Sequence, residues 1–339
     1  MKKHVNIPIF IPHYGCPNDC VFCNQKKITG KPCFERQSVI NEINTALESI
    51  DLEKIECELA FFGGSFTAIP RAEMLELLSI SDIYLKSGSI SSVRLSTRPD
   101  AITPEILDVL AFHGVRTIEL GLQSFSEGVL NASNRGHTAY DSEKACELIK
   151  NRGFKLIGQM MIGLPSSTLS DELFTAEKIC SLGCDGARIY PTVVFPDTEL
   201  DRMYQNGSYK KLTLEEAVTR TADVLEVFIT HSVPVIRIGL CSNETLNEKE
   251  YAENYHAAIG ELAINRFYLK KMDALLTTLD VTVGKSVSFS LPTGKISQAV
   301  GQKRANVIAL KEAFGLKNIK FTEDSALTPF NITINVLNT

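Results

Sequence analysis

Three cysteines stand close together near the start of the chain, in the stretch "HYGCPNDCVFCNQ" at residues 13–25. Cys16, Cys20 and Cys23 follow the spacing C-x3-C-x2-C. Thiolates in such a group are ligands for zinc or for an iron–sulfur cluster. A structural zinc site takes four ligands, usually as two separated pairs, and the sequence offers only His13 beside this triplet. Three thiolates on a [4Fe–4S] cluster fit better, because they leave one iron open to a small molecule.

The remaining six cysteines show no comparable grouping. Most of them lie in apolar segments, where a free cysteine packs as a small hydrophobic side chain. The chain of 339 residues begins with no secretory signal pattern, so we expect reduced thiols and a cytoplasmic protein. No apolar run approaches the roughly 20 residues of a membrane span, so we expect no membrane contact. These six are Cys33, Cys57, Cys146, Cys180, Cys184 and Cys241.

Charge is distributed unevenly along the chain, whose net charge is −5. Residues 281–339 contain seven basic and three acidic side chains, a net charge of +4. The preceding 280 residues contain 28 basic and 37 acidic side chains, a net charge of −9. Taken alone, the overall balance argues against a nucleic-acid protein, whereas the basic end indicates an acidic partner there.

Short apolar runs alternate with segments of helical period along most of the sequence. Nearly continuous apolar runs are typical of strands that are buried on both faces, as in a parallel sheet covered by helices. Capping residues such as Thr103 before Pro104 mark where helices begin. The expected strands are 6–12, 57–64, 92–97, 117–123, 156–164, 187–194 and 233–240, and the expected helices are 35–50, 70–86, 103–113, 138–152, 168–182 and 213–231.

Polar or glycine-rich motifs follow six consecutive strands. After the cysteine triplet they are "GGSFT", "STRPD", "GLQSF", "GLPSST" and "YPTVVFPDTEL". Folds built from βα units place their chemistry at the carboxyl ends of the strands. We therefore predict an α/β fold, a partial (βα)6-type TIM barrel at residues 1–240, with a site at this rim. A helical segment at 241–280 is expected to close or extend the barrel, and a small basic α/β domain is expected at 281–339.

The same motifs carry a resemblance to a known family. The triplet, with Phe22 before its last cysteine, resembles the signature of the radical S-adenosylmethionine (SAM) enzymes. The ordered set "FFGGSFT", "STRPD", "ELGLQS", "NRGHT", "MIGLP" and "YPTVV…DTEL" closely resembles the radical domain of the Elongator catalytic subunit and its bacterial relatives. A weaker resemblance extends to the oxygen-independent coproporphyrinogen oxidases. The resemblance covers about residues 7–240.

For the cysteines, the resemblance implies that Cys16, Cys20 and Cys23 bind three irons of a [4Fe–4S] cluster. It implies that the amino and carboxylate groups of SAM chelate the fourth iron. The reduced cluster then gives one electron to the sulfonium of SAM, and a 5′-deoxyadenosyl radical forms that abstracts hydrogen from a substrate. An electron donor such as flavodoxin or ferredoxin is the implied protein partner.

The resemblance also implies the contacts with SAM. Backbone carbonyls at Gly63, Gly64 and Ser65 would receive the methionyl amino group, and Arg135 would donate to the methionyl carboxylate. Taken by themselves, the glycines also suit a simple turn, Arg135 suits a surface ion pair, and Glu119 suits a buried polar network. The remaining implied contacts are Ser96, Gln123 and Gln159 for the ribose and methionine moieties, and Met161, Gly163 and Leu164 for adenine.

The substrate is indicated less directly. Elongator-type enzymes modify the wobble uridine of tRNA and carry an acetyltransferase domain that supplies the acetyl group. Only 99 residues, 241–339, follow the predicted barrel, so we expect no such domain and no acetyl-CoA chemistry. We predict a tRNA nucleotide as the substrate. The alternatives are a radical SAM enzyme that acts on a small molecule or peptide, with the C-terminal domain as a lid, and a non-catalytic zinc-bearing RNA-binding protein.

The C-terminal segment 287–324 carries a further resemblance. It reads strand, turn, short helix, "GQKR", longer helix and strand. This order resembles the core of a KH domain, an RNA-binding module whose G-x-x-G loop clamps the nucleic-acid backbone. Gly301 matches the first glycine of that loop, and Arg304 replaces the second. Lys303 and Arg304 suit phosphate by their charge, so RNA is the expected partner, and an ordinary α/β cap is the alternative.

Overall fold

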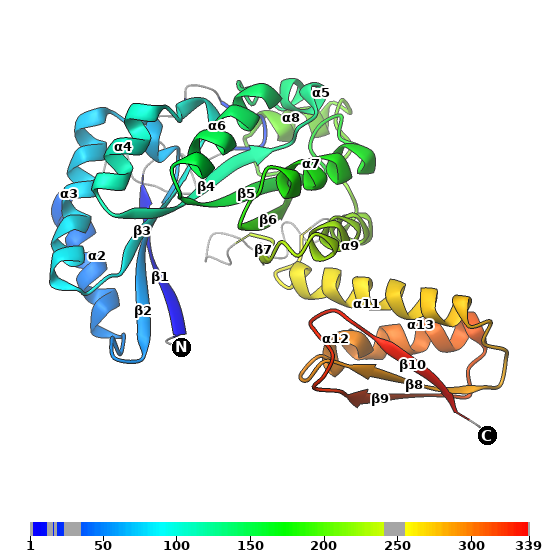
Figure 1. Cartoon of the computed structure of the whole chain (residues 1–339). Coiled ribbons are helices and arrows are strands. Elements are labelled where there is room, and N and C mark those ends of the chain that lie inside the picture. The colour runs from blue at the N-terminus through cyan, green and yellow to red at the C-terminus, as the bar shows by residue number, and fades with distance from the viewer. Residues whose placement is uncertain (1–2, 12–15, 17–18, 24–34, 241–254, 338–339) are drawn as a thin grey trace. The chain divides into compact units, whose positions relative to one another are not determined.

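The computed structural model describes residues 3–11, 16, 19–23, 35–240 and 255–337. His13, Cys33 and Cys241 lie outside these residues. The chain divides into two compact units, each described by itself below (Figure 1). The first unit comprises 1–211 and 233–236, and the second comprises 212–232 and 237–339.

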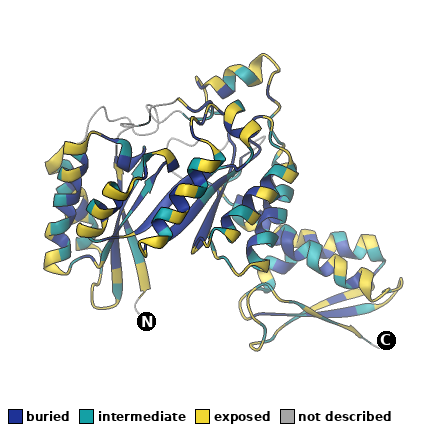
Figure 2. Ribbon diagram, turned by 45° about the horizontal axis from the view of Figure 1, so that its top comes forward, coloured by how far each residue is buried: buried dark blue, intermediate teal, exposed yellow. Residues whose placement is uncertain are grey.

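A seven-stranded sheet forms the centre of the first unit, with its strands in the order β1 to β7. Each of β1 to β5 pairs in parallel with the strand that follows it along the chain. Figure 2 shows the central strands buried along most of their length, as expected for a covered parallel sheet. The strands are β1 Lys3–Ile11, β2 Ile55–Gly63, β3 Ser92–Thr97, β4 Val115–Gln123, β5 Lys155–Ile162, β6 Gly186–Pro191 and β7 Val235–Ile238.

Helices connect successive strands and cover one face of the sheet (Figure 1). The approach is close where β5 meets α7, because a Cβ on Gly158 would lie 2.8 Å from the side chain of Ile179. Capping boxes start two of these helices, one built by Thr138 with Asp141 and one by Thr168 with Asp171. The helices are α2 Arg36–Glu48, α3 Arg71–Ser87, α4 Pro104–Phe112, α5 Glu127–Ala132, α6 Ala139–Asn151, α7 Leu169–Ser181 and α8 Glu199–Gln205.

The opposite face of the sheet, which we call the inner face, carries charged side chains in the middle of the strands. Glu119 on β4 is fully buried, and its carboxylate pairs with Arg94 on β3 at 2.8 Å and with Arg188 on β6 at 2.7 Å. Arg94 also pairs with Glu58 on β2 at 2.7 Å. Glu119 thus joins side chains of β3, β4 and β6 on the inner face of the sheet. The concave sheet is the expected partial barrel.

The second unit combines two long helices with a small sheet. α9 Leu214–Thr230 packs against α11 Ile259–Thr278, and Lys271 pairs with Glu226 at 2.8 Å between them. In the three-stranded sheet, β8 pairs in parallel with β9 and antiparallel with β10. The other elements are β8 Ser286–Leu291, α12 Ile296–Val300, α13 Ala305–Phe314, β9 Asn318–Glu323 and β10 Thr333–Leu337.

The predicted fold class is confirmed: an α/β half-barrel of parallel strands is followed by a small α/β module. Among the α-helices and strands of the described residues, the short helices α5 and α8 and the last strand, β10, were not predicted. The strand–helix–helix–strand order expected in the C-terminal segment is present as β8, α12, α13 and β9. In the part of the chain that the structure describes, no helix is long and apolar enough to cross a membrane.

Candidate active site at the carboxyl ends of the strands

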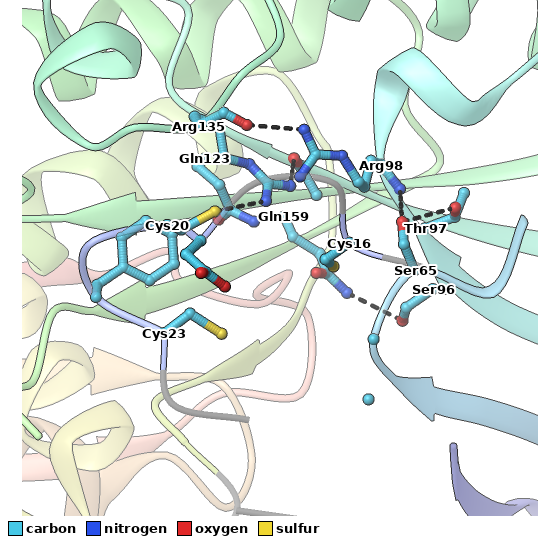
Figure 3. Close-up of a pocket in the computed structure, with 15 residues that line it drawn as sticks. Cys16, Cys20, Cys23, Ser65, Ser96, Thr97, Arg98, Gln123, Arg135 and Gln159 are labelled. Atoms are coloured by element: carbon cyan, nitrogen blue, oxygen red, sulfur yellow. Dashed lines mark hydrogen bonds between the residues drawn. The ribbon is translucent and has the colours of Figure 1, made fainter. Parts of the chain in front are cut away.

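A pocket at the carboxyl ends of the strands brings together most of the predicted site residues (Figure 3). All three cysteines of the triplet line it, as do seven of the ten residues predicted to contact SAM. Five further residues of the lining were not predicted as contacts. The predicted residues present are Cys16, Cys20, Cys23, Gly63, Gly64, Ser65, Ser96, Gln123, Arg135 and Gln159, and the additional ones are Asp19, Phe22, Thr97, Arg98 and Gly121.

Backbone hydrogen bonds hold the described part of the cysteine segment against the loop between α5 and α6 and against α8. The Val21 amide donates to the carbonyl of Ser133 at 3.1 Å, and the Val21 carbonyl accepts from the Leu200 amide at 2.8 Å. Val21 also packs with Leu200 and Tyr209 in a small apolar cluster. Contacts remote in the sequence therefore fix where Cys20 and Cys23 lie, so their spacing alone does not determine the geometry of the triplet.

Gly63 ends β2 in a conformation that only glycine adopts readily. Its φ is +115°, and a Cβ there would lie 2.5 Å from the carbonyl oxygen of Ile11 on β1. The backbone of Gly63 and Gly64 is consequently exposed to the pocket without a side chain in the way. The contact of this backbone with the methionyl amino group stays a prediction.

Ser65 and Thr97 join the ends of β2 and β3. Their hydroxyl oxygens lie 3.2 Å apart, and the Thr97 hydroxyl lies 2.5 Å from that of Thr67. Ser65 also accepts a hydrogen bond from the backbone amide of Arg98 at 2.9 Å. Its hydroxyl is therefore part of the wall of the pocket, and the backbone contact with SAM that the resemblance implies stays a prediction.

A bulge at the end of β4 directs Gln123 toward the pocket. The pairing of β4 with β5 shifts register between Gly121 and Gln123, and Gln123 has a φ of 64°. A left-handed conformation is unusual for glutamine, and such strain is concentrated at functional sites. The Oε1 atom of Gln123 is buried and has no partner among the described residues. This side chain is an acceptor held ready for a ligand donor.

Gln159 lies on the floor of the pocket and connects it to the inner face of the sheet. Its amide nitrogen donates to Glu119 at 2.8 Å and lies 3.5 Å from the hydroxyl of Ser96. Glu119 itself is not part of the pocket lining. It belongs to the buried polar network, which is one of the two roles that its sequence pattern allowed.

Two arginines line the pocket on the same side of Cys16 and Cys20 (Figure 3). Arg135 donates to the Sγ of Cys20 at 3.4 Å and to the carbonyl of Gly121 at 2.7 Å. Arg98 forms a bidentate pair with Asp100 and donates to the carbonyl of Arg135 at 2.8 Å. Arg135 is buried, so a surface ion pair, the alternative role considered for it, does not describe its position.

The pocket offers buried hydrogen-bond donors and positive charge, which suit an anionic group with acceptor atoms. Two buried guanidinium nitrogens, Nη1 of Arg98 and Nε of Arg135, have no hydrogen-bond partner among the described residues. Buried donors without partners cost free energy unless a ligand satisfies them. Thiolate-bound iron–sulfur and a methionyl carboxylate are acceptors of the required kind, so the residues fit the cluster and the SAM that the resemblance implies.

Burial raises the pKa of the Cys16 thiol, and the nearby positive charges of Arg98 and Arg135 oppose that rise. Such charges favour the thiolate, which is the form that binds metal. Among the described residues, no group of three His, Cys, Asp or Glu side chains is arranged to hold a metal ion. The cysteine ligands are therefore assigned from the sequence motif and from their common place in the pocket.

Three predicted contacts lie outside the lining of this pocket: Met161, Gly163 and Leu164. The Gly163 amide donates to Glu172 at 2.7 Å, and its carbonyl accepts from the Tyr209 hydroxyl at 2.7 Å. Leu164 is buried. Their proposed role toward adenine stays a prediction.

Arg98 is the most informative residue that the sequence analysis missed. The motif "STRPD" was singled out, but only Ser96 was taken from it as a contact. A signal was present, because an arginine beside the carboxyl end of a buried parallel strand lies at the rim where chemistry is expected. Two residues further on, Asp100 supplied the carboxylate that makes burial of this arginine tolerable.

The described cysteines outside the triplet behave as expected of core residues. Cys57, Cys146 and Cys184 are buried, Cys180 is partly buried, and none of the described cysteines forms a disulfide. Burial and a hydrogen bond with Cys146 raise the pKa of Cys184, which keeps its thiol protonated. These thiols serve packing and take no part in the pocket.

Comparison with known proteins agrees with this site. The model of the radical SAM superfamily matches residues 10–179, and the model of a radical SAM C-terminal domain matches residues 184–269. The uncharacterized protein MJ0486 of Methanocaldococcus jannaschii is 29% identical over 258 residues, which cover 73% of this chain and 78% of that protein.

Two further similarities concern the Elongator family. The tRNA uridine(34) acetyltransferase of Methanocaldococcus infernus is 32% identical over 130 residues, which cover 37% of this chain and 24% of that protein. The structure of archaeal Elp3 from the same organism has a TM-score of 0.59 at 19% identity, covering 80% of this chain and 64% of that one. The chain thus spans about a quarter of the acetyltransferase in sequence. The resemblance to the Elongator radical domain that the motifs predicted is confirmed.

The buried histidine of "NRGHT" predicts how stability depends on pH. Burial, together with the charge of Arg135, lowers the pKa of His137 to about 3. Between about pH 6.5 and pH 3, His137 therefore binds a proton in the unfolded chain but not in the folded chain. The free energy of unfolding should fall as the pH is lowered through this range, with a contribution of up to about 1.4 kcal/mol per pH unit from this residue.

Denaturant unfolding of His137→Gln at pH 7, 6 and 5 measures this contribution. The variant should lose part of the acid sensitivity of the wild-type chain. His231→Gln, which changes an exposed histidine, is the matched control and should retain it. Equal pH dependence in His137→Gln and the wild type would contradict the assignment.

Proposed function

Because the chain belongs to the radical SAM superfamily, we propose that it is a radical SAM enzyme that abstracts hydrogen from a tRNA nucleotide. The observation that carries the enzymatic part is the pocket in which the three cysteines meet two buried guanidinium groups and the glycine-rich end of β2. When bound, a [4Fe–4S] cluster and SAM supply the reductive cleavage that yields a 5′-deoxyadenosyl radical.

The residues of the pocket have distinct tasks in this proposal. Cys16, Cys20 and Cys23 hold the cluster. The backbone at Gly63 and Gly64 accepts hydrogen bonds from an ammonium group, because no side chain blocks it. Arg135 offers its unpartnered Nε to a carboxylate. Burial of these groups also excludes water, which would otherwise weaken the electrostatic contacts.

The first experiment is an anaerobic assay of the full chain. After reconstitution with iron and sulfide, and addition of dithionite and SAM, the chain should produce 5′-deoxyadenosine. Production should be lost in Cys16→Ala, Cys20→Ala and Cys23→Ala, together with iron content. Cys57→Ala, which changes a buried cysteine away from the pocket, is the control and should keep both.

Total tRNA from the source cell is then added to the same assay. We expect tRNA to stimulate 5′-deoxyadenosine formation, because the substrate donates the hydrogen atom that converts the 5′-deoxyadenosyl radical to 5′-deoxyadenosine. Formation without stimulation would retain the enzyme and remove tRNA, leaving a small molecule or a peptide as the substrate. A chain that binds zinc and no iron would contradict the radical chemistry altogether.

An aromatic surface beside the pocket supports a nucleobase as part of the substrate. This aromatic shelf consists of Phe10, Phe62 and Arg188 on the inner face. Phe10 is 52% exposed, its ring centroid lies 6.4 Å from that of Phe62, and the Arg188 guanidinium lies 5.5 Å from the Phe62 centroid. Unpaired bases stack on aromatic rings and on guanidinium planes.

The place of the shelf suits the chemistry. Phe62 directly precedes Gly63, which lines the pocket, and Arg188 is paired in the sheet with Gln159 on its floor. The salt bridge with Glu119 fixes the plane of Arg188. A base on this shelf would lie next to the site where the radical forms. The similarity to a tRNA uridine acetyltransferase supports the same choice of substrate.

Phe62→Leu tests the shelf, because it keeps apolar volume and removes the ring. Stacking is worth ~1–3 kcal/mol per base, so the tRNA concentration that gives half-maximal stimulation should rise by about tenfold. Formation of 5′-deoxyadenosine without tRNA should stay near the wild-type rate. Phe112→Leu, at an 85% exposed ring on α4, is the control and should match the wild type in both.

A second contact with RNA is proposed for the basic residues after α12. Lys303 and Arg304 are exposed, and both have left-handed backbone, with φ of 51° and 63°. Gly301 begins this turn with a φ of 77°, and Asn306 behind it donates to the Ala299 carbonyl at 2.9 Å. Two strained cationic residues side by side support a phosphate-binding role, since strain of this kind persists where function requires it.

Lys303→Gln combined with Arg304→Gln should weaken the apparent affinity for tRNA and make it less dependent on salt. The slope of log affinity against log salt should become shallower by about one for each phosphate that the variant no longer neutralises. The matched control changes two basic side chains of the first unit, Lys54→Gln and Arg152→Gln. If both double variants lose affinity equally, the C-terminal module contacts no RNA in the way proposed.

A further inference from the structure

Arg98 is buried and held in one orientation by its neighbours. Its side chain is 2% exposed. Its Nε and Nη2 atoms donate to the carboxylate of Asp100 at 2.7 and 3.1 Å, and Nη2 also donates to the backbone carbonyl of Arg135 at 2.8 Å. Two of the three guanidinium nitrogens are thereby used. The orientation of the third follows, because a guanidinium group is planar and rigid.

The third nitrogen, Nη1, is buried and meets no acceptor with good hydrogen-bond geometry among the described residues, although a side-chain hydrogen bond between Arg98 and Cys16 lowers the pKa of that thiol. Arg98 lines the pocket together with the three cysteines, and its charge interacts with those of Cys16 and Cys20 (Figure 3). Burial of a donor without a partner is costly, so this nitrogen requires an acceptor that belongs to the loaded site. The cysteine sulfurs and the sulfides of a cluster are acceptors at that place.

The arrangement places two guanidinium groups next to the triplet, and Asp19 supplies a carboxylate to the same lining. The charge of Arg98 is opposed by Asp100, whose side chain is 27% exposed and so partly screened by water. Arg135 donates only to the sulfur of Cys20 and to a carbonyl among its described partners, and it forms no ion pair with a carboxylate there. An added electron in this pocket is therefore stabilised by two guanidinium charges at low dielectric.

We propose that Arg98 is a positioning residue that would hold its charge and a buried N–H beside Cys16 and thereby make one-electron reduction of a bound iron–sulfur cluster easier. The inference rests on the proposed function, since it requires the cluster. The electron comes from an external one-electron donor, and one electron enters the cluster for each electron that the donor loses. The opposing charge of Asp100 sets how strongly the charge of Arg98 favours reduction of the cluster.

The test measures the midpoint potential of the reconstituted cluster, without SAM, by a redox titration followed by electron paramagnetic resonance. Arg98→Met removes the charge and should make the reduction equilibrium constant about tenfold less favourable, a shift of about 59 mV to lower potential for one electron. Asp100→Asn removes the opposing charge and should shift the potential the other way. Arg98→Lys should restore most of the wild-type potential.

The opposite signs separate this role from a merely structural one. A loosened pocket would shift the potential of Arg98→Met and Asp100→Asn in the same direction, or leave it unchanged, and either result would overturn the proposal. Asp100→Asn keeps the shape of the partly exposed side chain, so it remains informative if Arg98→Met fails to fold. Arg152→Met, which breaks the exposed pair with Asp108, is the control and should leave the potential unchanged.

Failure of the proposed function gives a different result. If the wild-type chain assembles no cluster, no potential is measured in any variant, and the radical chemistry fails with it. If the cluster forms and Arg98→Met keeps the wild-type potential while its affinity for SAM falls, the buried N–H serves the SAM carboxylate and the proposal for Arg98 is wrong.

Discussion

Arg135 is the side chain on which the geometry of the pocket depends. Its Nη1 donates to Cys20 and its Nη2 to the carbonyl of Gly121, so one planar group joins the cysteine segment to the end of β4. Its own carbonyl accepts from Arg98, which brings the end of β3 into the same assembly. Because a guanidinium group has fixed directions, three separate segments are held in one mutual arrangement. The backbone contacts around Val21 and the hydrogen bond from the Asn134 side chain to the Asp19 carbonyl at 2.9 Å support that arrangement independently.

The inner face of the sheet provides a rigid base for this assembly. Glu119 has no exposed surface, and it is acceptable there because two arginines and Gln159 satisfy its oxygens. Breaking such a buried network by removing one partner leaves a charge uncompensated, which costs about 3–5 kcal/mol, so alternative packings are strongly disfavoured. Gln159 is the link between the two levels, since it belongs to the network and to the floor of the pocket. The position of Gln159 in the pocket is thus set by its hydrogen bond with the buried Glu119.

The sequence predicted the sheet well because its information is local. Apolar runs predicted each of the strands β1 to β7, and capping residues predicted where helices begin. The rule that chemistry lies at the carboxyl ends of strands predicted most of the pocket residues from the sequence. What it missed depends on remote partners. Nothing near Gly163 indicates that Glu172 and Tyr209 bind its backbone, and nothing in "STRPD" says that Arg98 turns inward toward Arg135. The bulge that aims Gln123 arises from the register between β4 and β5, which is a property of the pair of strands.

In this pocket, pairing every buried polar atom would stabilise the fold, whereas binding a ligand requires some of these atoms to stay unpaired. A stable core would pair Nη1 of Arg98, Nε of Arg135 and Oε1 of Gln123, yet all three are buried without partners among the described residues. Gln123 adds backbone strain to this cost. Three of the eleven such atoms in the described residues belong to residues that line this one pocket, where a charged ligand with donors and acceptors would pair them. The free energy that these atoms do not contribute to folding is available for binding and orienting what enters the pocket.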